Sequence, residues 1–175
     1  NTNVIFAAPG EGSAAEYSRL YATAQAGMLT TTELNNSRPL LEASQHRDLV
    51  QLMQSESDEA LGEATNDIKL AFRYNEIQAI GKDENLAKAS KSAFEKASRE
   101  LLRETSRRQI AQDPMTRAEM FEFAQEQIDQ FMVSYTAALR VEYREYLEQQ
   151  IEDFTLGFRI DPNNPIGSVQ DWFDN

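Results

Sequence analysis

Apolar residues recur every three or four positions along most of the chain, which is the spacing of one face of an α-helix. The longest such pattern predicts a helix over about 117–156, or roughly 60 Å at 1.5 Å per residue. Its apolar positions are Met120, Phe121, Ala124, Ile128, Phe131, Met132, Tyr135, Leu139, Tyr143, Leu147, Ile151 and Phe154. We expect the aromatic members to form core rather than to line a cofactor groove.

Three further helices are predicted at about 14–27, 40–80 and 84–112. The second of these is the least secure element. Residues 54–59 are nearly all Ser, Glu or Asp, and Gly62 lies inside the pattern. A glycine in a helix interior costs about 1 kcal/mol relative to alanine, so we expect a bend or break near 55–62.

Local signals set the boundaries of these helices. Residues 13–16 and 116–119 have the spacing of a capping box, Ser or Thr followed three positions later by Glu. Gly81-Lys82-Asp83 predicts a tight reversal, because glycine readily takes the left-handed conformation after a helix. The polar stretch 30–36 predicts a connection.

These elements predict an all-α fold: an elongated antiparallel helical hairpin or three-helix bundle of long helices, with extended N- and C-terminal arms. Residues 1–12 contain Pro9, Gly10 and Gly12 and predict an extended arm. We expect a single helical domain over 13–157, followed by a tail at 158–175 that carries an aromatic anchor.

Composition excludes several classes of function. The chain has no cysteine, so disulfides and thiolate metal sites are excluded. No apolar run approaches the roughly 20 residues of a membrane span, and we expect a soluble chain without one. The net charge of −12 argues against direct nucleic-acid binding.

Charge is unevenly divided among the long helices. Residues 82–112 carry 8 basic and 5 acidic groups, whereas 38–81 carry 4 and 8, and 114–158 carry 3 and 9. In one interpretation, complementary flanks select how the helices pair. In the other, four arginines of the basic helix form a docking patch for an anion or an acidic partner. These are Arg99, Arg103, Arg107 and Arg108.

The sequence offers no constellation for catalysis. His46 is the single histidine, so the paired Glu-x-x-His motifs of a di-iron bundle are absent. A zinc site is disfavoured for the same reason. There is also no Gly-x-Ser-x-Gly elbow and no phosphate-binding glycine loop. We therefore expect no catalytic residues, metal or cofactor, and we interpret His46 as an exposed surface residue of a helix.

Apolar residues near both ends are candidates for partner binding. Val4, Ile5 and Phe6 lie in the N-terminal arm, and Val169, Trp172 and Phe173 follow two prolines in the C-terminal tail. Either group could fold back onto the helices or insert into a partner as an anchor. Apolar groups at both ends of long helices are typical of a subunit held in a larger assembly.

The composition of the chain resembles that of helical virion proteins of tailed bacteriophages, such as internal core or ejection proteins. The resemblance rests on the Ala7-Ala8-Pro9-Gly10 arm, on the Gln-, Glu-, Arg- and Ala-rich stretches 107–112 and 148–151, and on the absence of cysteine. A second likeness is to helical minor pilus subunits of type IV secretion, although the chain shows no signal peptide. Neither resemblance assigns a role to any residue.

The function expected from these features is that of a non-enzymatic structural or assembly protein. Such a subunit would associate with protein partners, as a homo-oligomer or within a multi-subunit complex such as a virion, through its helix stripes and apolar ends. The alternative is an acidic helical binding module, a chaperone or an inhibitor of a basic partner protein. The compartment cannot be read from the sequence.

Overall fold

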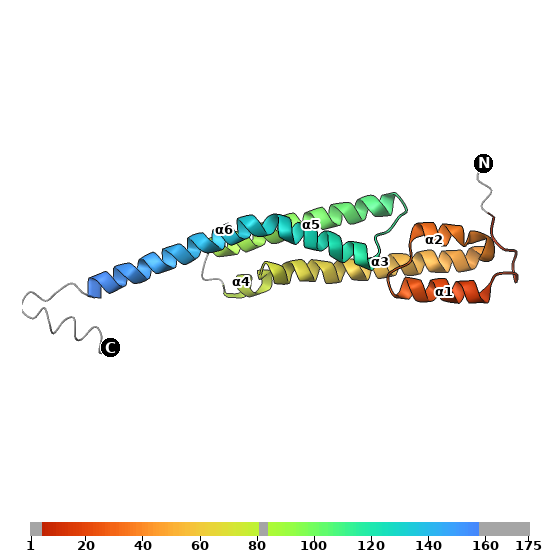
Figure 1. Ribbon diagram of the computed structural model, residues 1–175, viewed down its shortest axis with the longest axis horizontal. Helices are drawn as coiled ribbons and strands as arrows, with labels where there is room; N and C mark the ends of the chain where they lie inside the picture. Colours follow the sequence, from red (N-terminus) through yellow and green to blue (C-terminus); the bar gives the residue numbers. More distant parts are fainter. Residues whose placement is uncertain (1–4, 81–83, 158–175) are drawn as a thin grey trace, which may run out of the picture.

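The computed structural model describes residues 5–80 and 84–157, and every regular element within these ranges is helical. The all-α prediction is thereby confirmed. The elements form a narrow rod (Figure 1). In chain order they are α1 (Ala14–Gln25), α2 (Thr31–Asn36), the 3-10 turn η1 (Arg38–Leu40), α3 (Ala43–Ala71), α4 (Tyr74–Ile80), α5 (Glu84–Ile110) and α6 (Arg117–Gly157).

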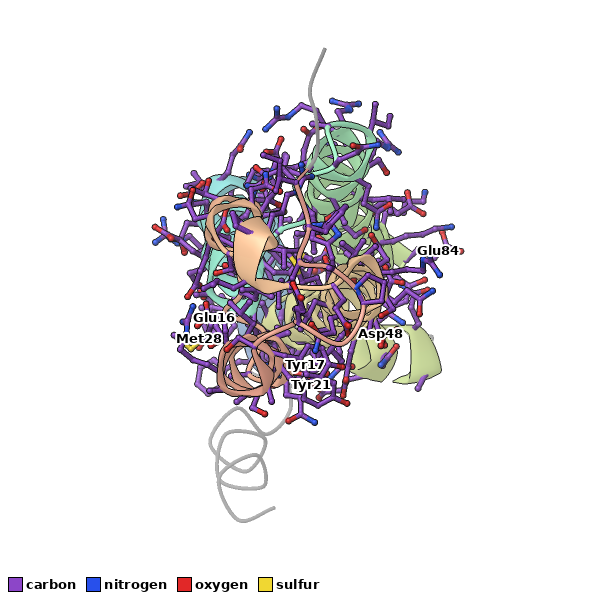
Figure 2. All side chains as sticks on the ribbon, turned by 90° about the vertical axis from the view of Figure 1, so that its right-hand side faces the viewer. Glu16, Tyr17, Tyr21, Met28, Asp48 and Glu84 are labelled. Carbon is purple, nitrogen blue, oxygen red and sulfur yellow. The ribbon has the colours of Figure 1, made fainter. Side chains whose placement is uncertain are left out.

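At one end of the rod, α1 and α2 pack against the first half of α3 (Figure 1). Their shared core consists of Leu20, Ala24, Leu29, Leu34, Leu41, Leu49 and Met53. Seen along the rod in Figure 2, Tyr17 and Tyr21 lie next to each other on α1, with ring centres 5.9 Å apart. The chain before α1 is tied to this end by hydrogen bonds from the Ala7 and Ser13 amides to the carbonyls of Leu41 and Leu40, at 2.8 and 2.9 Å.

The middle of the rod is a three-helix bundle of α3, α5 and α6 (Figure 1). Its core consists of Ala60, Ala64, Ile68, Phe72, Ile77, Ala93, Ala97, Leu101, Met115, Met120, Ala124, Ile128 and Tyr135. The buried positions of α5 are mostly small, including Ser90, Ala93 and Ala97. Small side chains allow neighbouring helices to approach closely, which suits a slender bundle.

The predicted helix over 40–80 differs from the structure at both ends and in the middle. It begins only at Ala43, where Glu42 and Gln45 form a capping box. It runs through Gly62 without a break, because Gly62 faces open space. The buried face also continues through the polar stretch, with Met53 before it, Ser57 within it and Ala60 after it. The interruption lies instead after Phe72, at Arg73, whose φ of 54° cannot continue a helix.

The stretch 30–36, predicted as a connection, contains α2. Thr30 caps this helix by accepting a hydrogen bond from the Glu33 amide at 3.1 Å, and Leu34 supplies its buried contact. A hydroxyl cap followed by one buried leucine is a weak signal in sequence, and a helix of 6 residues has no measurable period. The predicted reversal at 81–83 lies outside the described residues.

The last helix extends well beyond its neighbours. Leu139 is the last residue of α6 that packs against the bundle core. From there the helix continues over residues 140–157, a further 18 residues or about 27 Å. Figure 1 shows this segment running past α4 and the start of α5. We call residues 140–157 the arm. Within the described ranges, no helix combines the length and apolarity needed to cross a bilayer.

Candidate interaction surface

The arm exposes an apolar stripe that continues the buried face of α6. Within the bundle, α6 buries Met120, Ala124, Ile128 and Tyr135. The same helical spacing then passes through Leu139 to Tyr143, Leu147, Ile151 and Phe154. Tyr143 is 64% exposed and Leu147 is 42% exposed. Both lie on the face of α6 that is buried earlier in the helix, within the bundle. Large apolar groups gathered on an exposed face mark an interaction site.

This stripe borders a shallow groove where the arm leaves the bundle. The groove is lined by Thr136, Leu139, Arg140, Tyr143, Arg144 and Leu147. Its lining is mainly apolar and includes the side chains of Arg140 and Arg144. An apolar centre beside charged residues has the anatomy of a protein–protein contact rather than of a small-molecule pocket.

The residues predicted for partner binding at the chain ends are only partly described. Ile5 is 68% exposed. Phe6 folds back onto the rod: its ring lies edge-on to His46 at 5.2 Å and under the Arg38 guanidinium at 5.9 Å. Val4, Val169, Trp172 and Phe173 lie outside the described residues. Of the two described anchors, Phe6 thus lies in a contact within the chain and Ile5 is exposed.

The four arginines predicted as a docking patch lie along α5, and three of them form ion pairs within the chain. Arg103 pairs with Glu100 at 2.9 Å, and Arg107 pairs with Glu104 one turn away. Arg108 is largely buried. It pairs with Glu119 of α6 at 2.6 Å and donates to the Asp113 carbonyl at 2.7 Å. These partners raise the pKa of Arg107 and Arg108 above the ordinary value, chiefly through the hydrogen bonds that the arginines donate to Glu104 and Glu119.

Arg99 is placed differently from the other three. It is exposed at the edge of a groove between α3 and α5, with Leu61, Phe94 and Leu102 on the groove floor. The paired arginines have their charge neutralised locally, whereas Arg99 forms no ion pair with a described residue. Most described ion pairs of α5 thus join residues of the same helix, and Arg108 with Glu119 is the one that links α5 to α6.

His46 is not the exposed surface residue that the sequence suggested. It is half-buried under Phe6, and its Nε2 atom has no hydrogen-bond partner within the described chain. Burial lowers the pKa of His46, and the nearby Arg38 charge lowers it further, so the ring is neutral at pH 7. The prediction failed because the residues that cover His46 come from the N-terminal segment at Phe6 and from η1, which the helix pattern does not reveal.

A cleft lies beside His46 at this end of the rod. It measures about 530 Å³ and is lined by residues of α2, η1, α3, the end of α5 and the turn after it, including Arg38, His46 and Gln112. No carboxylate, hydroxyl or second imidazole lies within hydrogen-bond distance of His46 Nε2 in the described chain. Among the described residues, no group of three or more His, Asp or Glu side chains is placed to hold a metal ion.

The exposed stripe of the arm was predicted as core, and the helix pattern alone could not separate the two halves of α6. The usable signal was relative length. The predicted helix over 84–112 is shorter than the predicted helix over 117–156, so this neighbour could not cover the longer helix along its whole length. Comparisons of this chain with protein-family models, with curated proteins and with solved structures found no match.

Proposed function

We propose that this protein is a non-enzymatic assembly subunit, a helical rod that joins a larger complex through the arm of α6. One observation supports the proposal above all: the apolar face that α6 buries within the bundle continues along the arm, where Tyr143 and Leu147 are exposed. Exposing an apolar helix face to water is unfavourable. Burying that face against a partner removes the apolar surface from water and so stabilises the complex. A virion is one assembly that would suit such a subunit, given the compositional resemblance.

The division of α6 into two halves favours assembly over a purely internal role. Within the bundle, apolar residues hold the three helices together. Among the described residues, the bundle core and the hydrophobic side chains packed against it end at Leu139, before the arm begins. The exposed side chains of Tyr143 and Leu147 are therefore best explained as contacts that form with another chain.

In-cell photo-cross-linking tests this proposal. A photoreactive phenylalanine analogue would replace Tyr143 in the chain produced by its native source, and cross-linked products would be identified by mass spectrometry. The matched control places the same analogue at Val133, which is 76% exposed on the outer face of α6 within the bundle. We expect position 143, and not position 133, to give a discrete product with a defined protein. Equal or absent cross-linking at the two positions would contradict the proposal.

A further inference from the structure

The arm carries a row of charged residues beside its apolar stripe. One position after each of Leu139, Tyr143, Leu147 and Ile151 lies a charged side chain. In chain order these are Arg140, Arg144, Glu148 and Glu152. All four are exposed, and none forms an ion pair with a described residue. The row therefore consists of two positive positions followed by two negative ones, along a single edge of the stripe.

Two-fold symmetry determines which charged residues of a second copy this row would face. When two identical helices pack in antiparallel fashion about a two-fold axis, the same edge of each helix lies on the same side of the contact, and the two edges run in opposite directions. Centred near Tyr146, this arrangement brings Arg144 level with Glu148 of the second copy. By the same operation Arg140 comes level with Glu152. In a parallel pair, each edge would instead face the opposite edge of the other helix. Arg144 would then not face Glu148, and Arg140 would not face Glu152.

We infer that the occupant of the stripe is a second copy of this chain, paired arm to arm in antiparallel orientation. The inference rests on the proposed function and names the partner of the same surface. Three features of the arm argue for it together: the exposed apolar stripe, its continuity with the face that already packs helices in the bundle, and the self-complementary charge row. Opposite charges at the edges of paired helices select partner and orientation.

The size of the contact predicts its strength. Two arms of 18 residues that touch along one stripe belong among the small interfaces, those below about 1,200 Å², which are typically weak and transient. The dimer should therefore form and dissociate with concentration. Its shape is also fixed: the two bundles lie at the outer ends, joined by a two-helix neck, so the particle is far longer than one rod.

Charge reversal on the purified full chain tests the partner. Light scattering across a dilution series should show the mass rising from 19.9 kDa towards twice that value. Arg144→Glu or Glu148→Arg alone turns two symmetry-related attractions into repulsions, and we expect each to weaken the dimer about tenfold. The double variant, Arg144→Glu with Glu148→Arg, restores the match and should restore dimerisation. Circular dichroism would check that each variant is folded.

Glu145→Arg is the matched control. It changes the charge by the same amount as Glu148→Arg, but position 145 lies two residues after Tyr143 and therefore on the far side of the helix from the stripe. We expect its dissociation constant to stay within about threefold of the wild-type value, the range for an exposed charge away from a contact. A loss equal to that of Glu148→Arg would mean that net charge, not the antiparallel pairing, governs association, and would overturn the inference.

Single cysteines test the orientation, since the chain has no native cysteine. In the antiparallel pair, Leu147→Cys lies close to its own copy across the two-fold axis and should form an interchain disulfide on oxidation. Tyr143→Cys lies too far from its copy, because a disulfide needs Cα atoms within about 7 Å. Cross-linking at both positions would indicate a parallel pair and would overturn the inference.

The outcomes separate this inference from the proposed function. A chain that stays monomeric at all concentrations, while position 143 cross-links to a different protein in cells, overturns the self-pairing and leaves the assembly role standing. A monomer whose position 143 reacts with nothing, because another segment of the same chain covers it, contradicts both. Small-angle X-ray scattering adds a shape criterion: a dimer no longer than one rod would also overturn the arm-to-arm arrangement.

Discussion

At the scale of single residues, the junction between the two cores depends on Gly27. Its φ is +69°, a conformation that other residues rarely adopt. Its carbonyl accepts the Arg117 amide at 2.7 Å, which satisfies one of the unpaired donors at the start of α6. A Cβ atom at position 27 would lie 2.7 Å from the Arg117 Cβ. Any side chain there must displace the start of α6.

Gly27→Ala should therefore destabilise the fold, by about 1–3 kcal/mol, since backbone strain and a steric clash act together. Gly62→Ala is the matched control with the opposite sign. A Cβ at Gly62 meets nothing within 4 Å and removes a helix-breaking residue, so a gain of about 0.5–1 kcal/mol is expected. Urea unfolding of the two variants measures both. Similar effects at the two glycines would refute the role assigned to Gly27.

The acid behaviour of the chain should depend in part on Glu16. Hydrogen bonds from Arg19 and then from the Ser37 hydroxyl lower the pKa of Glu16 from 4.5 to about 2. Arg19 also pairs with Glu33 at 2.7 Å, so this cluster joins α1 to α2. Because the folded-state pKa is the lower one, the stabilisation is fully present above pH 4.5. It is lost as the pH falls towards 2.

Glu16→Gln should accordingly cost stability at neutral pH and make no difference near pH 2. We expect a cost of about 1 kcal/mol or less, because Arg19 is half-exposed and water screens the pair. Chemical unfolding at several pH values between 7 and 2 measures the difference. Glu59 is an exposed glutamate of α3 without an ion pair to a described residue. Glu59→Gln should therefore leave the free energy of unfolding unchanged across this pH range. A cost at Glu16 that does not shrink with acid would contradict this account.

At the scale of elements, the end of α3 is held by a hydrogen bond from another helix. Phe72 is fully buried, and its carbonyl accepts the Ser90 hydroxyl of α5 at 2.8 Å. The ring of Phe72 also meets Tyr135 of α6 edge-on at 5.4 Å. The point where α3 gives way to α4 is thus fixed by contacts with both partner helices.

Ser90→Ala should leave the Phe72 carbonyl buried without a donor, at a cost of about 1–3 kcal/mol. Ser106→Ala, at an exposed serine of the same helix, should change stability by less than about 0.5 kcal/mol. Thermal unfolding of both variants provides the comparison. Equal effects would mean that the hydrogen bond to Phe72 contributes nothing.

The two halves of α6 should respond differently to the same kind of truncation. Ile128→Ala opens a cavity in the bundle and should cost about 2–4 kcal/mol. Leu147→Ala removes an exposed residue of the arm and should change the unfolding of the dilute chain by less than about 0.5 kcal/mol. Urea unfolding at low micromolar concentration measures both. A large loss at Leu147 would show that the arm packs within its own chain.

The helices could be predicted from the sequence because their apolar period is long, and α6 keeps it for its whole length. What the period could not supply was the position of interruptions and of partners. The structure shows α3 continuing past Gly62, which faces solvent, and ending at Ala71, just before the left-handed Arg73, although no local residue forbids a helix there. Likewise, one stripe is buried up to Leu139 and exposed beyond it, since burial depends on where neighbouring helices end.

At the scale of the whole molecule, the parts that stabilise the fold are separate from the arm. Two cores, one around Leu49 of α3 and one around Ala97 of α5, hold the described helices together. The arm lies outside both. Electrostatics contributes little to the bundle itself, because most described ion pairs lie at the surface, where each adds little stability. We propose that charge matters more in the arm, where the charge row would favour pairing with a second copy in antiparallel orientation.

Hydrogen exchange along α6, measured over a dilution series, tests this account most directly. In dilute solution the amides of the arm should exchange much faster than those of 117–135, because an uncovered helical segment frays readily. As the concentration rises, exchange in the arm should slow at least severalfold while 117–135 stays unchanged. Exchange in the arm that is independent of concentration would contradict the claim that the arm pairs with a second copy of the chain.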